Sequence, residues 1–194
     1  MIRNFTILCK LNLQYISDIQ FFSDSTLGFK AFKALCPSCK SKGCLSKHDS
    51  YPRYLIGMER GEPKTFTINV SRFICSTCGK SHALLPDVLV PYGSYSITFI
   101  LSVLKEYFSR KSTVSALCQK YIISISTLYS WKCLYLKHKA LWLGVLQNMS
   151  ASPSDFLVRI FNLPDFSDLT KDFFAKLAFS FMQGSSLMTT SHLP

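Results

Sequence analysis

Four of the eight cysteines in this 194-residue chain form two C-x-x-C pairs. The pairs are CPSC at residues 36–39 and CSTC at residues 75–78, with 35 residues between them. Two residues between thiolates let both sulfurs of a pair reach one tetrahedral metal ion. Pro37 presets the backbone of the first turn, and Gly79 supplies a positive φ after the second. The spacing therefore predicts one structural zinc ion in a closed site with four thiolate ligands: Cys36, Cys39, Cys75 and Cys78.

The chain between the two pairs is predicted to form a β-hairpin. Residues 51–56 and 64–74 have strand-like composition, and they flank a turn at residues 59–63. Alternate residues from Phe66 to Val70 are apolar, which is typical of a half-buried strand. A hairpin that carries one C-x-x-C turn on each side has the plan of a zinc ribbon.

Two other interpretations of the cysteine pairs were open. They could be unrelated surface turns, or a thioredoxin-like redox pair; a redox motif needs a C-x-x-C at the start of a helix in a βαβ unit, and that pattern is absent from the sequence. Cys44, His48 and His82 lie near the pairs and could replace a ligand. Each has a simpler interpretation, because His48 falls in a polar stretch, His82 is redundant, and Cys44 would be a fifth thiolate.

The chain is strongly basic, with 22 Lys+Arg, 11 Asp+Glu and a net charge of +11. Residues 30–139 hold 17 Lys+Arg and 5 Asp+Glu, so the whole excess lies in the middle of the chain. Nucleic acid is the commonest partner of such a chain, ahead of an anionic membrane surface. The content of apolar and aromatic residues, 48% and 14%, excludes a disordered chain.

After residue 93 the apolar pattern becomes helical. Ser94 or Ser96 can cap a first helix, Thr113 a short second one and Ser124 a third, with a tight turn at residues 122–123. Three helices with a short middle one are the plan of a helix-turn-helix, whose third helix enters the major groove of DNA. A plain three-helix packing unit is the alternative. Together these patterns predict an α+β fold, in which a small zinc-ribbon hairpin precedes a mainly helical part.

One run within this region carries a resemblance. Residues 117–131, LCQKYIISISTLYSW, are similar to the helix-turn-helix of bacterial transposases and resolvases. In that pattern the small residue of the second helix corresponds to Cys118, and the Ser, Thr and Trp positions correspond to Ser124, Thr127 and Trp131. The resemblance implies that residues 125 onward form the DNA-recognition helix.

A wider set of marks extends the resemblance to residues 36–131, about half of the chain. The marks are CPxC at the first pair, Arg72, CxxCGKxHALLP at residues 75–86, and Pro91 followed by Tyr92. They resemble a family with a zinc ribbon and a helix-turn-helix that is encoded by insertion sequences of Gram-positive bacteria and has no assigned function. This implies a protein of a mobile element, either a transposase-like DNA-binding portion or an accessory factor.

The predicted recognition helix departs from the pattern that it resembles. Ile122 stands where the turn has glycine, and Ile125 and Ser130 stand where basic residues are common. No arginine is therefore available there for a bidentate contact with guanine. Contacts with phosphates or base edges are predicted for polar residues at the start of this helix: Ser124, Ser126, Thr127, Tyr129, Ser130 and Lys132. In the ribbon, contacts with phosphates are predicted for basic residues: Lys40, Lys42, Lys47, Arg53, Arg72 and Lys80.

No catalytic constellation stands out, and the chain is predicted not to be an enzyme. Asp155, Asp165, Asp168 and Asp172 crowd into one short stretch without the pattern of an acidic triad that binds divalent metal. No phosphate-binding loop of the G-x-x-x-x-G-K-[ST] type is present.

The predicted partner is duplex DNA, and the alternative is a zinc-stabilised module that binds RNA or an acidic protein. No apolar run approaches the roughly 18 residues of a membrane span, and the first ten residues make a poor signal peptide. We therefore expect a cytoplasmic, nucleoid-associated protein that binds no membrane. A Phe-rich helix that continues to Met182, with Gly184 as a stop, is expected to pack on the other helices or to form a homodimer.

The charge and the motifs divide the chain into five predicted segments. They are an N-terminal segment that can add a strand to the ribbon (1–35), the zinc ribbon (36–92), the three-helix unit (93–145), a C-terminal helical segment for packing or dimerisation (146–184) and a disordered tail (185–194).

Overall fold

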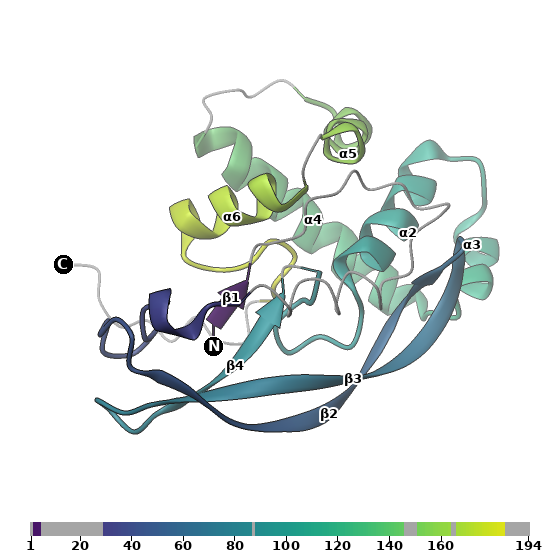
Figure 1. The fold of residues 1–194 in the computed structure, drawn as a ribbon. Helices are drawn as coiled ribbons and strands as arrows, with labels where there is room; N and C mark the ends of the chain where they lie inside the picture. Colours follow the sequence, from purple (N-terminus) through teal and green to yellow (C-terminus); the bar gives the residue numbers. More distant parts are fainter. Residues whose placement is uncertain (1, 5–28, 87, 146–150, 164–165, 185–194) are drawn as a thin grey trace.

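The computed structural model describes residues 2–4, 29–86, 88–145, 151–163 and 166–184, which form an α+β fold (Figure 1). Three antiparallel strands are followed by five helices, which confirms the predicted fold class. The strands are β2 (Leu45–Glu59), β3 (Glu62–Cys75) and β4 (Ser81–Pro86), and the helices are α2 (Ile97–Ser109), α3 (Val114–Tyr121), α4 (Ile125–Val145), α5 (Pro153–Asn162) and α6 (Phe166–Leu177).

A short strand, β1 (Ile2–Asn4), extends the sheet beyond β4. It pairs in parallel with β4, so the order of the strands is β1-β4-β3-β2. One turn of 3₁₀ helix, η1 (Ala31–Lys33), leads into the first cysteine pair. The rest of the predicted N-terminal segment, residues 5–28, and the predicted disordered tail, residues 185–194, lie outside the described residues.

The hairpin of β2 and β3 is the frame of the sheet. Its strands pair from Leu45 with Cys75 to Glu59 with Glu62, so they are longer than predicted and leave a turn of only two residues. In that turn Arg60 and Gly61 have φ values of 52° and 87°, as in a type I′ turn, which matches the twist of the flanking strands. The first half of β2 is polar and has no apolar face, so the strand could not be recognised there from the sequence. Backbone hydrogen bonds with β3 hold this half in place.

The hairpin and the helices share one large core. Leu55 and Val70 of the hairpin are fully buried in the same cluster as Phe99 and Leu101 of α2 and Leu128 of α4. Each such side chain contributes about 1.5–3 kcal/mol to stability when it leaves water. Figure 1 shows the hairpin running beneath the helical layer. Packing against the helices therefore holds the distal half of the hairpin in place.

Hydroxyl side chains begin the three central helices. The hydroxyls of Ser96, Thr113 and Ser124 each accept a hydrogen bond from the backbone N–H three residues further on, at 3.0–3.2 Å. Such a cap contributes about 1 kcal/mol to the stability of a helix. Of the two serines predicted as the first cap, Ser96 is therefore the one that caps the helix.

A carboxylate joins α2 to α3. Glu106 accepts hydrogen bonds from the Lys120 ammonium at 2.6 Å and from the Tyr121 hydroxyl at 2.9 Å. Burial alone would raise the pKa of Glu106, but these donors outweigh it and hold that pKa below its usual range. On the α4 side, the Trp131 ring packs edge-on against Phe99 of α2, with 6.0 Å between the ring centroids. These contacts fix α3 and α4 on α2.

The turn between α3 and α4 keeps its tight geometry without a glycine. Ile122 has a φ of 52° and ends α3 in the left-handed conformation, while its N–H and that of Ile123 bond back to the last turn of α3. A β-branched residue in this conformation is strained. The Ile122 side chain is 84% exposed, so no packing compensates for the strain.

The Phe-rich C-terminal segment packs inside the chain. Helix α6 ends at Leu177, and Ala178 with a φ of 60° turns the chain, so the predicted continuation of the helix to Met182 is wrong. Phe181 and Met182 are nevertheless buried beside His138 of α4, whose Nδ1 accepts the Met182 N–H at 2.9 Å. Burial lowers the pKa of His138 to about 4, with a smaller contribution from the charge of Lys137. Dimerisation through this helix stays a prediction.

Replacing Ile122 with glycine should stabilise the protein. The left-handed conformation costs a non-glycine residue about 1–2 kcal/mol, and glycine avoids this strain. Glycine also loses more entropy on folding, which offsets about 0.5–1 kcal/mol of the gain. We expect Ile122→Gly to raise the free energy of unfolding by about 0.5–1 kcal/mol in urea titrations. Ile122→Ala is the matched control, because it removes the exposed side chain and keeps the strain. A less stable Ile122→Gly variant would contradict the turn geometry.

Candidate metal centre

Two similar backbone turns present the four cysteines. In the first turn the Cys36 N–H donates to the Ser41 carbonyl, and the Lys40 N–H donates to the Cys36 carbonyl. The Cys75 N–H donates in the same way to Lys80 in the second turn, and the Gly79 N–H donates to Cys75; all four bonds measure 2.9–3.0 Å. Lys40 and Gly79 occupy the same position in the two turns, with φ values of 63° and 67°. The first turn precedes β2 and the second follows β3. Pairing of Leu45 with Cys75 therefore brings both turns to the open end of the hairpin.

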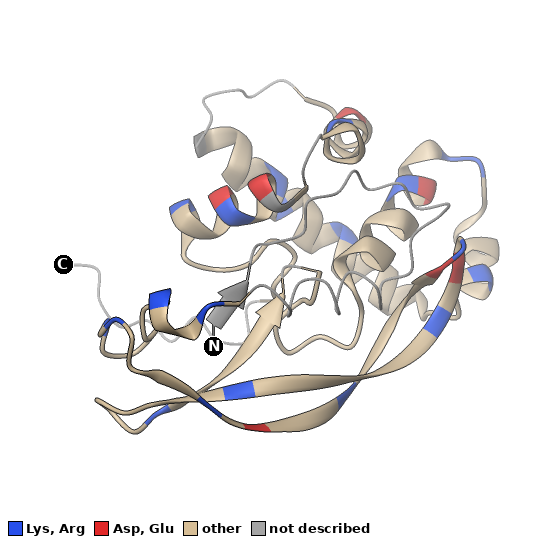
Figure 2. Ribbon diagram, viewed as in Figure 1, with Lys and Arg blue, Asp and Glu red and all other residues tan. Residues whose placement is uncertain are grey.

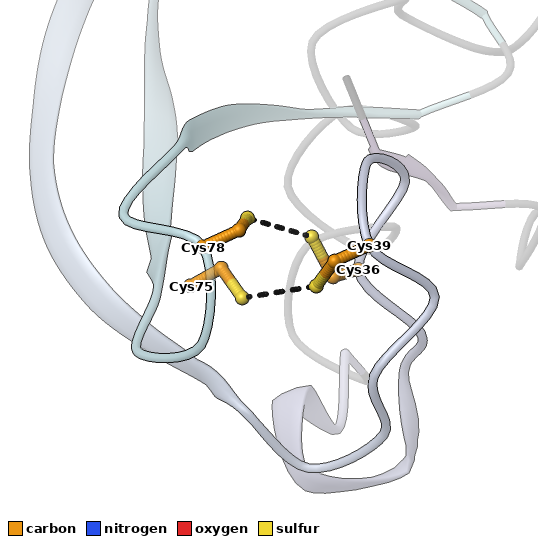
Figure 3. Close-up of side chains that lie close together, drawn as sticks. All are labelled: Cys36, Cys39, Cys75 and Cys78. Carbon is orange, nitrogen blue, oxygen red and sulfur yellow. Dashed lines mark hydrogen bonds between the residues drawn. The ribbon is translucent and has the colours of Figure 1, made fainter.

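The four predicted thiols converge on one point (Figure 3). The Sγ atoms of Cys36 and Cys78 are 3.7 Å apart, those of Cys39 and Cys75 are 3.6 Å apart, and all four lie within 4.8 Å of one another. A tetrahedral ion with metal–sulfur bonds of about 2.3 Å separates its sulfurs by about 3.8 Å. The seven cysteines of the described residues are all free of disulfides. The four cysteines are thus placed to hold one metal ion, and a set of four thiolates is one that zinc prefers.

The backbone around the sulfurs favours ionised cysteines. Burial opposes ionisation of Cys75, but the N–H groups of Cys78 and Thr77 and the thiol of Cys44 outweigh it and lower the pKa of Cys75 to about 6. The Lys80 N–H favours the Cys78 thiolate, but burial and the other sulfurs, Cys75 first, outweigh it and raise the pKa of Cys78 to about 12. Four adjacent thiolates therefore need a cation among them, and a divalent metal supplies its charge.

Cys44 is a fifth sulfur beside the cluster. Its Sγ lies 3.2 Å from that of Cys75, and its thiol donates to the carbonyl of Ser41 at 3.2 Å. The hydrogen bond with Cys75, together with burial and the neighbouring sulfurs, raises the pKa of Cys44. Cys44 therefore keeps its proton, which it donates to the Ser41 carbonyl, and its sulfur lies against that of Cys75 in a second layer.

His82 is a second group of this layer. It is only 5% exposed, and its Nε2 lies 3.3 Å from the Cys36 sulfur. Burial, followed by nearby positive charge, lowers the pKa of His82, so the ring is neutral near pH 7. A ring protonated at Nε2 donates to the Cys36 sulfur. His48 has an exposed side chain in β2 and is not part of the cluster.

Sequence reasoning named Cys44 and His82 but missed this second layer. Cys44 reaches Cys75 because it adjoins the first pair of β2 and β3, and the Ser76 N–H donates to its carbonyl at 2.9 Å. His82 reaches Cys36 because β4 folds back along β3. The register of the predicted hairpin could have indicated the position of Cys44, since a residue just before β2 must lie near the end of β3.

The two arginines among the predicted ribbon contacts are engaged within the chain. Arg72 donates through its Nε to Asp49 at 2.6 Å and forms a second bond with the same carboxylate. Arg53 donates through Nη2 to the carbonyls of Val90 and Gly93. The lysines predicted with them are exposed: Lys40, Lys42, Lys47 and Lys80. Figure 2 shows basic residues on both the hairpin and the helices.

The structure brings the predicted helix contacts together at the start of α4. The hydroxyl of Ser124 lies 2.8 Å from those of Ser126 and Thr127, so these three groups satisfy one another around the cap. Tyr129 and Ser130 are exposed, and the Lys132 ammonium lies 5.4 Å from the centre of the Tyr129 ring. Contact of these residues with DNA stays a prediction.

Comparison with known families gives one match. Residues 36–131 match the family model for DUF6431, a domain of unknown function, and the first residue of the matched stretch is Cys36 of the metal cluster. Neither the curated proteins nor the solved structures contain a match to the chain. Within the described residues, no helix combines the length and the apolar character that crossing a membrane requires.

Substitution should separate the ligand Cys75 from its neighbour Cys44. We expect Cys44→Ser to bind one metal ion per chain with an affinity lowered by about tenfold at most. Loss of a second-layer partner costs about 10- to 100-fold, but the serine hydroxyl can still donate to the Ser41 carbonyl and lie beside Cys75. Cys75→Ser removes a thiolate and should lose far more affinity. Competition with a chromophoric chelator measures both. Equal losses in the two variants would make Cys44 a ligand.

Proposed function

We propose that this protein is a non-catalytic, zinc-stabilised DNA-binding protein that contacts duplex DNA through the start of α4. The observation that carries the proposal is the arrangement of α2, α3 and α4, in which a capped eight-residue helix and a tight turn lead into a helix with an exposed N-terminal end. This order and turn length are those of a helix-turn-helix, whose third helix enters the major groove. Its association with a mobile element rests on the sequence resemblance alone.

The charge of the chain supports this proposal. A net charge of +11 favours a polyanion, and the excess falls within residues 30–139, which form the hairpin and the first three helices of the described chain. The start of α4 offers hydroxyls and Lys132 but no arginine, so phosphate contacts and shape would dominate over direct base reading.

In this proposal zinc has a structural role. Four thiolates close its coordination shell, so no position remains for a reactive water. The ion would tie the two ends of the hairpin together, while the distal half of the hairpin packs against the helices. Removal of zinc should therefore weaken DNA binding indirectly, through loss of structure.

One observation favours a second candidate, a module that binds another protein. Ile122 and Ile125 at the turn before α4 are 84% and 52% exposed, and Tyr129 on the next turn is 41% exposed. Exposed apolar residues that gather at one corner are typical of a protein interface. A partner recovered from lysate treated with nuclease, and lost in Ile122→Ser, would support this candidate.

A salt series tests the DNA-binding proposal. We expect the affinity for a labelled duplex of mixed sequence, measured by fluorescence anisotropy, to fall by about 0.9 log unit per log unit of salt for each phosphate contacted. Lys132→Gln should reduce that slope by about 0.9, because it removes one contact. Lys176→Gln, on α6, is the matched control and should leave the slope unchanged. Affinity that is absent or independent of salt would refute the proposal.

A further inference from the structure

We propose that Cys44 and Cys75 form an oxidative modification site, at which a hydroperoxide converts the two thiols into a disulfide and thereby withdraws one ligand from the metal centre. The inference rests on the four-thiolate site and is independent of DNA binding. Among the described residues, it concerns the one thiol beside the cluster, Cys44, that is not one of the four predicted ligands.

The distances single out this pair of sulfurs. Cys44 Sγ lies 3.2 Å from Cys75 Sγ, closer than the 3.6 Å between Cys39 and Cys75 or the 3.7 Å between Cys36 and Cys78. A sulfur–sulfur bond of about 2.05 Å therefore needs a movement of little more than 1 Å. The thiols within a metal tetrahedron are held apart by the ion, but no such ion separates Cys44 from Cys75.

The backbone also holds the two residues close together, at the end of the ladder of β2 and β3. The Ser76 N–H donates to the Cys44 carbonyl at 2.9 Å, and the next pair, Leu45 with Cys75, begins the ladder of β2 and β3. Cys44 is thus the diagonal neighbour of Cys75 across the two strands, and this position brings their sulfurs to 3.2 Å from each other. The bridge can therefore form without unfolding the hairpin.

Exposure assigns the order of the steps. Cys44 is partly exposed, whereas Cys75 is fully buried, so the oxidant meets Cys44 first. Cys44 first loses its proton to water, and its thiolate sulfur attacks one oxygen of hydrogen peroxide; the O–O bond breaks, and the departing hydroxide takes up a proton to become water, which leaves a sulfenic acid on Cys44. The Cys75 thiolate then attacks the Cys44 sulfur, the S–O bond breaks, and hydroxide leaves. Two electrons from the two sulfurs have reduced one peroxide.

The disulfide would weaken binding of the metal ion. Once Cys75 is bound to Cys44, three thiolates remain: Cys36, Cys39 and Cys78. A three-thiolate set holds a structural ion far more weakly, so the ion should be released, and a thiol reductant should restore the original site. Oxidation would thus act as a reversible control on the turn that follows β3.

Three forms of the zinc-loaded full chain test the proposal: the unaltered protein, Cys44→Ser and Cys133→Ser. Each is treated with millimolar hydrogen peroxide while released zinc is followed with a chromophoric chelator. Disulfides are then mapped by mass spectrometry after alkylation of the free thiols. Cys133 is an exposed free thiol on α4 outside the metal cluster, so it is the matched control for loss of one reactive cysteine.

We expect the unaltered protein and Cys133→Ser to release their zinc together with the appearance of a Cys44–Cys75 disulfide, and to rebind zinc after reduction. Cys44→Ser should keep its zinc for several-fold longer. Release from Cys44→Ser as fast as from the unaltered protein, or a disulfide between two other cysteines, would overturn the proposal. If Cys44→Ser fails to load zinc, the disulfide map of the unaltered protein decides the question alone.

Discussion

Four thiols converge at the open end of the β2–β3 hairpin, where a metal ion would hold the two ends of the hairpin together. A hairpin of this length has a polar first half with little apolar burial of its own. Two turns with the same hydrogen-bond pattern close that end and aim their sulfurs at one point. A metal ion held there joins two stretches of chain 35 residues apart, and closing a loop of that size removes much of the freedom of the unfolded chain.

The opposite end of the hairpin is secured in another way. There Leu55, Ile68 and Val70 enter the core that α2 and α4 share. The hairpin thus connects the metal centre to the three-helix unit, with thiolates at one end and apolar packing at the other. Through this connection, we expect loss of the ion to affect a surface on α4 that the ion does not touch.

Local rules explain what could be predicted from the sequence. The C-x-x-C spacing led to the four cysteines, and Ser or Thr before an apolar run led to the helix starts, because both depend on neighbouring residues alone. Tertiary contacts explain what was missed. Lys40 adopts the left-handed position that the second turn gives to Gly79, and Ile122 does the same after α3, since hydrogen bonds of the surrounding turn override residue preference. The second layer of Cys44 and His82 depends on the strand register, and the end of α6 depends on the burial of Phe181 and Met182 beside His138.

We infer that four sulfurs alone bind the metal, with His82 in a second layer. X-ray absorption spectroscopy at the zinc edge of the natively purified, unaltered protein measures this set of ligands. We expect one zinc per chain with a single shell of four sulfurs at about 2.3 Å. A nitrogen shell at about 2.0–2.1 Å would place His82 among the ligands, and protein purified without zinc would contradict the assignment of a zinc site.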